Sequence, residues 1–233
     1  MKILTLIFFT LLLSASAFCK IPTDSFPSEK APERFWSRTV LDIGLNQLQN
    51  IPSPLALNAW RSKGVNLYYY KEFRIIQRKL TLNPGIGLGL DNYSFSNDIV
   101  ISTGNDHSFQ YHTDTLKRDI LKTKLAANYV DIPLELRYST KPNDPGAFRV
   151  AIGAKAGVLF NAHSKIKYVQ EGATHKSKER DDFGVNQFRY GIIGRLGFSY
   201  FNIFGYYSLS DFFDKGKGPN AVPIMFGITL SDF

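Results

Sequence analysis

The sequence predicts an all-β protein: an eight-stranded, antiparallel, up-and-down transmembrane β-barrel with a cleaved N-terminal signal peptide. The chain opens on a secretory leader, eight later segments alternate apolar and polar residues, and the connections between them alternate between short and long. Together these features indicate a chain that is exported and then inserted into a membrane as a closed sheet.

Residues 1–17 have the composition of a secretory signal peptide. A single Lys precedes an apolar run that ends at Leu13, and Ala15 and Ala17 supply the small side chains that cleavage requires. The apolar run is too short to cross a bilayer as a helix. We therefore expect cleavage before Phe18.

A lipoprotein cut immediately before Cys19 is the alternative processing route. It is disfavoured because Phe18 stands where a lipidation site needs a small residue. Cys19 is the only cysteine, so an intramolecular disulfide framework is excluded. Residues 18–37 carry several prolines and mixed charge and are expected to form a periplasmic linker, which leaves residues 38–233 for the barrel domain.

Eight segments after the linker show the period of two that a strand with two different faces produces. In the clearest segment, apolar residues alternate with Asp131, Glu135 and Arg137. No run after Leu13 approaches the roughly 18 apolar residues of a spanning helix, and only residues 115–127 have any helical periodicity. The predicted strands are residues 38–46, 64–73, 79–93, 129–138, 148–160, 188–198, 203–209 and 222–230.

The connections alternate in length. Those after the second, fourth and sixth strands are short, whereas those after the other strands are long. Outer-membrane barrels combine short periplasmic turns with long external loops. An even strand count then places the N- and C-termini on the periplasmic side.

One face of every predicted strand is apolar, which calls for lipid or a second layer of structure. A soluble sheet with one solvated face is the alternative. Aromatic residues near the strand ends favour lipid, because such rings form girdles at both membrane interfaces. They are Tyr68, Tyr69, Tyr70, Phe73, Tyr93, Tyr129, Tyr138, Phe148, Phe160, Tyr190, Phe198, Tyr200, Phe201, Phe204, Tyr206 and Tyr207.

The opposite face carries charged residues of both signs in near balance. Eight strands enclose a space that side chains can fill, and buried charges persist when they are paired. We therefore expect an ionic network that closes the lumen, with inner-face glycines making room for it. Its predicted members are Asp42, Glu72, Asp131, Glu135, Arg137, Arg149, Lys155, Arg189 and Arg195.

The segment YVDIPLELRY, residues 129–138, resembles the Tyr-x-(Glu/Asp)-Ile-Pro-Leu-x-x-(Lys/Arg)-Tyr strand of an outer-membrane β-barrel family that is abundant in Bacteroidetes-type bacteria. This family includes PorT-like proteins and is similar to small OmpX-like barrels. The matching residues are Tyr129, Asp131, Ile132, Pro133, Leu134, Arg137 and Tyr138. NPGIGLGL, GAKAGVLF and the terminal Phe233 fit the same family, over residues 36–233.

This resemblance implies an outer-membrane location and, for the PorT-like members, a role in protein secretion across that membrane. Phe233 resembles the signal that the barrel-assembly machinery reads. The resemblance carries over no catalytic residue and no cofactor.

Four histidines, His107, His112, His163 and His175, lie in predicted external loops. The pairs His107–Ser108 and His112–Asp114 are the candidates for a nucleophile and base of a lipid A deacylase or acyltransferase. No nucleophile motif frames either pair, and His107 with His112 does not form a zinc motif. We expect no catalytic residue and no metal.

The formal net charge is +8, and much of it lies in the long loops. Basic residues there are suited to the phosphates of lipopolysaccharide, although interspersed acids are equally consistent with a solvated loop. The expected partners are outer-membrane lipids including lipopolysaccharide, the barrel-assembly machinery and a protein or surface ligand at the loops; the compartment excludes nucleic acid. We expect a non-enzymatic structural, adhesive or secretion-accessory protein, with a lipid-modifying enzyme and a narrow porin as alternatives.

Overall fold

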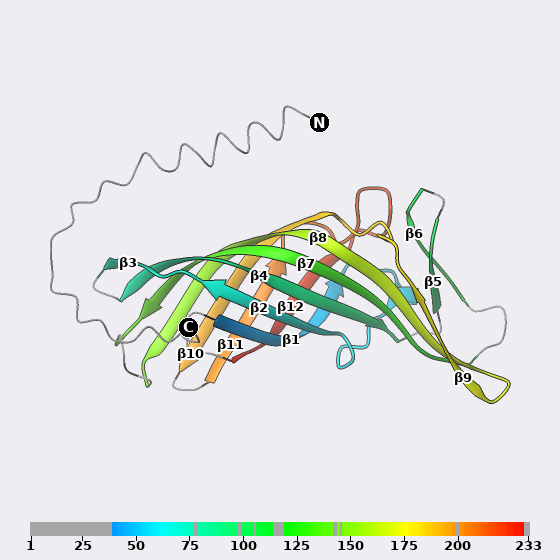
Figure 1. Cartoon of the computed structure of the whole chain (residues 1–233), viewed down its shortest axis with the longest axis horizontal. Helices are drawn as coiled ribbons and strands as arrows, with labels where there is room; N and C mark the ends of the chain where they lie inside the picture. Colours follow the sequence, from blue (N-terminus) through cyan, green and yellow to red (C-terminus); the bar gives the residue numbers. More distant parts are fainter. Residues whose placement is uncertain are drawn as a thin grey trace, which may run out of the picture. The chain divides into compact units, whose positions relative to one another are not determined.

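Eight antiparallel strands of the computed structural model close into a ring (Figure 1). Because β1 pairs with both β2 and β12, and β10 pairs with both β8 and β11, the ring has no free edge. This confirms the predicted fold class. The ring consists of β1 (Thr39–Gln49), β2 (Lys63–Tyr70), β4 (Leu80–Phe95), β7 (Asp119–Ser139), β8 (Phe148–Gln170), β10 (Phe188–Phe198), β11 (Phe201–Ser208) and β12 (Val222–Leu230).

The structure describes residues 39–230 apart from 77–78, 97–98, 105, 114–118, 142–143, 145 and 199–200. The predicted signal peptide, the linker and Phe233 lie outside the described residues. No helix in the described part of the chain is long and apolar enough to cross a membrane.

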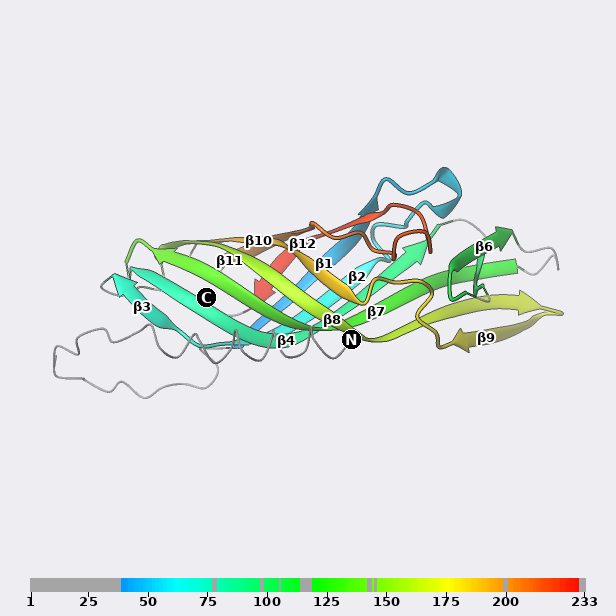
Figure 2. The ribbon, with the colours of Figure 1, turned by 90° about the horizontal axis from the view of Figure 1, so that it is seen from above.

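Further strands extend the ring in the connections. β3 (Phe73–Ile76) pairs with β4, β5 (Ile99–Thr103) and β6 (Phe109–Thr113) form a separate hairpin, and β9 (Ala173–Glu179) pairs with β8. One 3-10 turn, η3 (Ser53–Leu55), lies between β1 and β2. β7 and β8 are the longest strands, at 21 and 23 residues, and with β9 they extend to the far end of the unit in Figure 2.

The helical interpretation of residues 115–127 is wrong where the structure describes them, because β7 begins at Asp119. Thr123 and Leu125 face the protein interior while Lys122 and Lys124 face away, which is the period of a strand. The long connections predicted at 94–128 and 161–187 are therefore largely strand.

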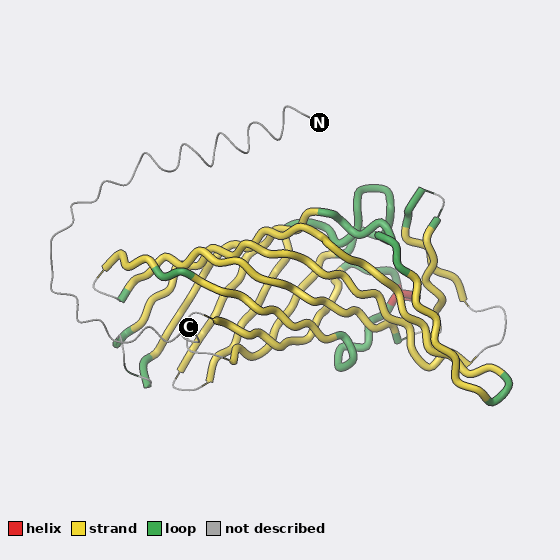
Figure 3. The backbone as a smooth tube through the Cα atoms, in the orientation of Figure 1, coloured by secondary structure: helices red, strands yellow, loops and turns green. Residues whose placement is uncertain are grey.

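The connections divide the ring into two ends, seen in the tube view of Figure 3. The short-turn end holds the start of β1, the end of β12 and the connections that follow β2, β7 and β10. The long-loop end holds the other connections.

The outward side chains are apolar and exposed along the ring, as a lipid-facing surface requires. Outward aromatic residues lie toward both ends: Phe148, Phe198 and Phe201 are neighbours in the ladder at the short-turn end, and Phe160, Phe188 and Tyr190 lie toward the long-loop end. Six predicted girdle residues instead point inward, because they occupy the opposite phase of their strands; these are Tyr68, Tyr70, Tyr93, Tyr129, Phe204 and Tyr206.

An apolar plug fills the ring at the long-loop end. Inward residues of β4 and β7 pack there against the β5–β6 hairpin and the loops, and Phe109 contacts Phe213 with ring centroids 4.7 Å apart. The Phe109 amide donates to the Lys217 carbonyl at 2.7 Å, which fixes the hairpin to the last long loop. The plug comprises Leu48, Leu55, Tyr93, Phe95, Ile99, Ile101, Phe109, Leu125, Ala127, Tyr129, Phe183, Val185, Phe212, Phe213 and Ala221.

Candidate functional site

Arg195 on β10 is the centre of the part of the lumen network that lies nearer the short-turn end. Its guanidinium donates to both carboxylate oxygens of Asp42, with Nη2 at 2.9 Å from Oδ2, and its Nε lies 3.0 Å from Oε1 of Glu135. The Thr229 hydroxyl donates to Asp42 at 2.7 Å. One buried cation therefore connects β10 with β1 and β7, and β12 joins through Thr229.

Glu135 has two further partners on the inner face. The Tyr70 hydroxyl donates to Oε1, and Nε of Arg137 donates to Oε2 at 2.9 Å. The Arg137 guanidinium also lies 4.2 Å from the centroid of the Tyr70 ring. The carboxylate is thus satisfied on both oxygens, as a buried anion must be.

Arg189 is the centre of the part of the network that lies nearer the long-loop end. Its Nε and Nη2 bind the two oxygens of Asp131 at 2.9 and 2.7 Å, and its Nη1 binds Asp91. The Lys155 ammonium lies 3.6 Å from Asp131 and donates to the Tyr68 hydroxyl, which itself donates to Asp131 at 3.0 Å. Paired charges and phenols therefore occupy the middle of the lumen.

Seven of the nine predicted network residues come together in this way, and four acids balance four bases once Asp91 is included. The brought-together residues are Asp42, Asp131, Glu135, Arg137, Lys155, Arg189 and Arg195. Asp91 is not among the predicted members of the network. The sequence analysis places Tyr68 and Tyr70 in the girdle. Their inward phase beside carboxylates is the signal that identifies them as hydrogen-bond donors of the network.

Glu72 does not join the network, so this part of the prediction is wrong. β2 ends at Tyr70, and in the short link before β3 Glu72 pairs instead with Arg74 at 3.0 Å, with both side chains about half exposed. Arg149 lies half-buried near the start of β8, at the short-turn end.

Two inner-face glycines make room for the side chains around Arg189. A Cβ at Gly89 would overlap the Arg189 guanidinium, and one at Gly157 would overlap the Asp131 carboxylate. The cavity that remains beside Lys155 and Arg189 measures about 10 Å³, which is room for about one water molecule. Side chains therefore fill this part of the lumen.

The comparison with protein-family models matches residues 40–214 to the outer membrane protein beta-barrel domain. The chain belongs to this outer-membrane β-barrel family. It is therefore an outer-membrane protein, and the match begins in β1 and extends beyond β11. Comparisons with curated proteins and with solved structures gave no match.

The segment 129–138, which resembles a strand motif of such barrels, lies on β7. Tyr129, Asp131 and Pro133 face inward, where the Tyr129 ring lies 3.9 Å from the Arg189 guanidinium. The other motif residues divide between the two faces, with Ile132, Leu134 and Tyr138 exposed outside and Arg137 in the network.

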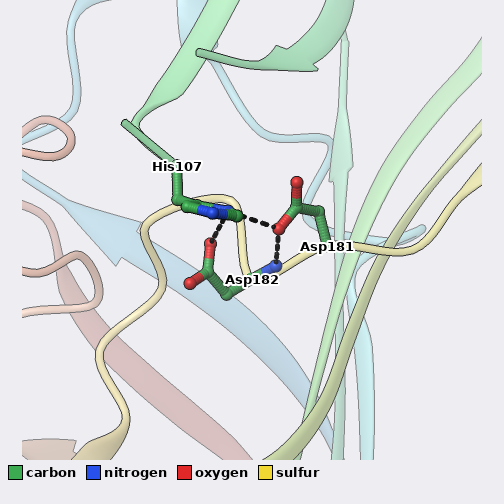
Figure 4. Close-up of side chains that lie close together, drawn as sticks. All are labelled: His107, Asp181 and Asp182. Carbon is green, nitrogen blue, oxygen red and sulfur yellow. Dashed lines mark hydrogen bonds and ion pairs between the residues drawn. The ribbon is translucent and has the colours of Figure 1, made fainter. Parts of the chain in front are cut away.

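At the long-loop end of the barrel, His107 contacts two acids from the connection between β9 and β10 (Figure 4). Its Nδ1 lies 3.0 Å from Asp181 Oδ1 and 3.7 Å from Asp182 Oδ1. The hydrogen bond to Asp181, and then the charges of Asp181 and Asp182, raise the pKa of His107 above 6.5. The three residues offer ligand atoms within 4.8 Å of one another, and the ion pair accounts for this spacing.

His107 and Ser108, the candidate pair of the enzyme alternative, have different partners. The Ser108 hydroxyl donates to Asp106 at 2.5 Å, while His107 is turned toward Asp181. The predicted pair of His112 with Asp114 lies partly outside the described residues.

Replacing Arg195 by Leu tests how much the network contributes to the free energy of unfolding. The substitution leaves Asp42 and Glu135 buried without their shared cation, so we expect the free energy of unfolding to fall by about 3–5 kcal/mol. Urea unfolding in lipid vesicles, followed by circular dichroism, measures it. Arg74→Leu removes the same cation from an exposed pair and should cost less than about 1 kcal/mol. Equal losses in the two variants would contradict the network's role.

The His107 contact predicts a pH dependence at the long-loop end. Because the folded pKa is raised, the contact contributes its full stability below the unfolded pKa of about 6.5 and loses it as pH rises through the folded value. NMR titration of labelled histidine in detergent micelles should show His107 titrating above 6.5, and Asp181→Asn should lower that midpoint. An unchanged midpoint in Asp181→Asn would refute the contact.

Proposed function

We propose that this protein is a non-conducting, non-enzymatic outer-membrane barrel that acts through its long-loop end in a structural, adhesive or secretion-accessory role. The observation that carries the proposal is the double closure of the lumen. Ion pairs fill the middle, and the apolar plug fills the long-loop end. A pore has no path through such an interior, whereas the projecting strands remain available to partners.

In this proposal the short-turn end and both termini are periplasmic, and the long-loop end is extracellular. The division into short and long connections supports this orientation, since outer-membrane barrels have short periplasmic turns. Residues 129–138 support a PorT-like relationship and with it the secretion-accessory role. The proposed partners are outer-membrane lipids including lipopolysaccharide, the barrel-assembly machinery, and a protein or surface ligand at the long-loop end.

The absence of catalysis is part of the proposal. The best-placed serine and histidine of the loops bind different acids, because Ser108 donates to Asp106 and His107 contacts Asp181. An acyl-transferring or deacylating enzyme needs the histidine to accept the proton of its nucleophile.

Reconstitution of the folded full chain in planar bilayers tests the proposal. We expect no ion conductance, since ion pairs and the apolar plug fill the lumen among the described residues, while a porin reconstituted in the same way provides the positive control. In parallel, mass spectrometry of lipid A from cells producing the wild type or His107→Ala should give identical profiles. Stable conductance steps would support the porin alternative, and a lipid A change that His107→Ala abolishes would support the enzyme.

A further inference from the structure

Six lysines form a regular array on three adjacent strands beyond the ring. In the ladder, Lys124 is paired with Lys165 and Lys165 with Lys178, while Lys122 is paired with Lys167 and Lys167 with Lys176. Directly paired residues, and residues two apart on one strand, lie on the same face of a sheet. The lysine array, defined as Lys122, Lys124, Lys165, Lys167, Lys176 and Lys178, therefore occupies a single face in two rows.

This face is the outer one. The alternate β7 residues Thr123 and Leu125 face inward, where Leu125 packs in the plug and the Thr123 hydroxyl donates to the Ile99 carbonyl at 2.6 Å. Lys122 and Lys124 consequently point away from the interior, and the pairing places their β8 and β9 partners beside them.

The array continues the lipid-facing surface of the barrel. Along the outer face toward the ring, the next cross-strand pairs are Ala126 with His163 and then Asn128 with Asn161. Next to these two pairs, on the side of the ring, Val130 on β7 and Phe160 on β8 are exposed at 37% and 54%. The lysines therefore begin two cross-strand pairs beyond the exposed apolar residues, toward the long-loop end, and so lie above the apolar band rather than within it.

The array also forms a concave site. A cavity of about 300 Å³ opens among its side chains, which is at the lower end of the size range of ligand pockets. The described residues that line it include no carboxylate; they are Asn92, Lys122, Lys124, His163, Lys165, Lys167 and Lys176. Glu179, the acid at the end of β9, is paired with Ser164 and so lies on the opposite face.

Among the described residues, the ladder places one carboxylate, Asp119, beside the array on this face, paired with Val169 beyond Lys167, and it does not line the cavity. Like charges directly opposite each other destabilise a sheet. Burial and then the neighbouring Lys122 lower the pKa of Lys124, and burial followed by Lys178, Arg180 and Lys165 lowers the pKa of His163. A bound anion would relieve the repulsion between these paired lysines.

We propose that the lysine array binds the phosphate groups of lipid headgroups in the outer leaflet around the barrel. Its outward direction, on the barrel face that carries exposed Val130 and Phe160 two cross-strand pairs away, favours lipid over a soluble anion. The inference rests on the proposed orientation, in which the long-loop end is extracellular. Lysine ammonium groups bind phosphate as point charges, and several of them can hold a bisphosphorylated glycolipid.

The test measures binding of lipid A that carries both phosphates to the folded full chain in detergent micelles, with dephosphorylated lipid A as the comparison. The triple variant Lys124→Gln, Lys165→Gln and Lys167→Gln should weaken binding of the phosphorylated lipid at least about tenfold, with a reduced salt dependence. The matched control replaces Lys71, Lys79 and Lys141 by Gln, since these exposed lysines lie at the short-turn end, and it should bind as the wild type does.

Replacing the three array lysines by Arg instead should retain binding, and heat-modified migration in gels verifies that each variant is folded. Equal affinity for dephosphorylated lipid A, or equal loss in the control variant, would overturn the proposal. Displacement of the lipid by millimolar inorganic phosphate would show that the site takes soluble phosphate rather than a headgroup. Because this readout is independent of conductance, its failure is distinguishable from failure of the proposed function.

Discussion

The burial of charge inside a narrow ring of strands is the constraint on which the rest of this structure depends. An ionised group without a partner in such an interior costs many kcal/mol, so every acid in the lumen needs a base within reach. Arg195 and Arg189 meet that need by spanning the lumen, since each binds carboxylates from two other strands. Glycines such as Gly89 and Gly157 leave the space that these long side chains occupy.

Much of the ring could be predicted from the sequence because the lipid imposes a strict period of two. β10 and β12 have the predicted bounds, and the inward charges on β7 and β10 follow from their phase. The phase alone could not show that β2 ends at Tyr70, which is why Glu72 was misplaced. It also could not identify the partners of a charge, and Asp91 meets Arg189 across 98 residues of sequence.

The long-loop end was much less predictable, for a related reason. The plug brings together scattered apolar residues such as Phe109 and Phe213, which follow no period and meet only once the chain is folded. The lysine array depends on the register of three strands, so separate lysines in the sequence give no indication of its regular rows. Both features concern contacts between distant segments, whereas periodicity reports on each segment alone.

The most direct test of a lipid-facing exterior and a closed, charge-paired interior is a scan of single spin-labelled cysteines along β10 in lipid vesicles, with Cys19 replaced by Ser. We expect labels at outward positions such as Ile192 and Leu196 to collide frequently with oxygen dissolved in the bilayer. Labels at inward positions such as Ile193 should be shielded from both oxygen and a water-soluble nickel chelate. Uniform access of the chelate along the strand, or no alternation between neighbouring positions, would contradict the account.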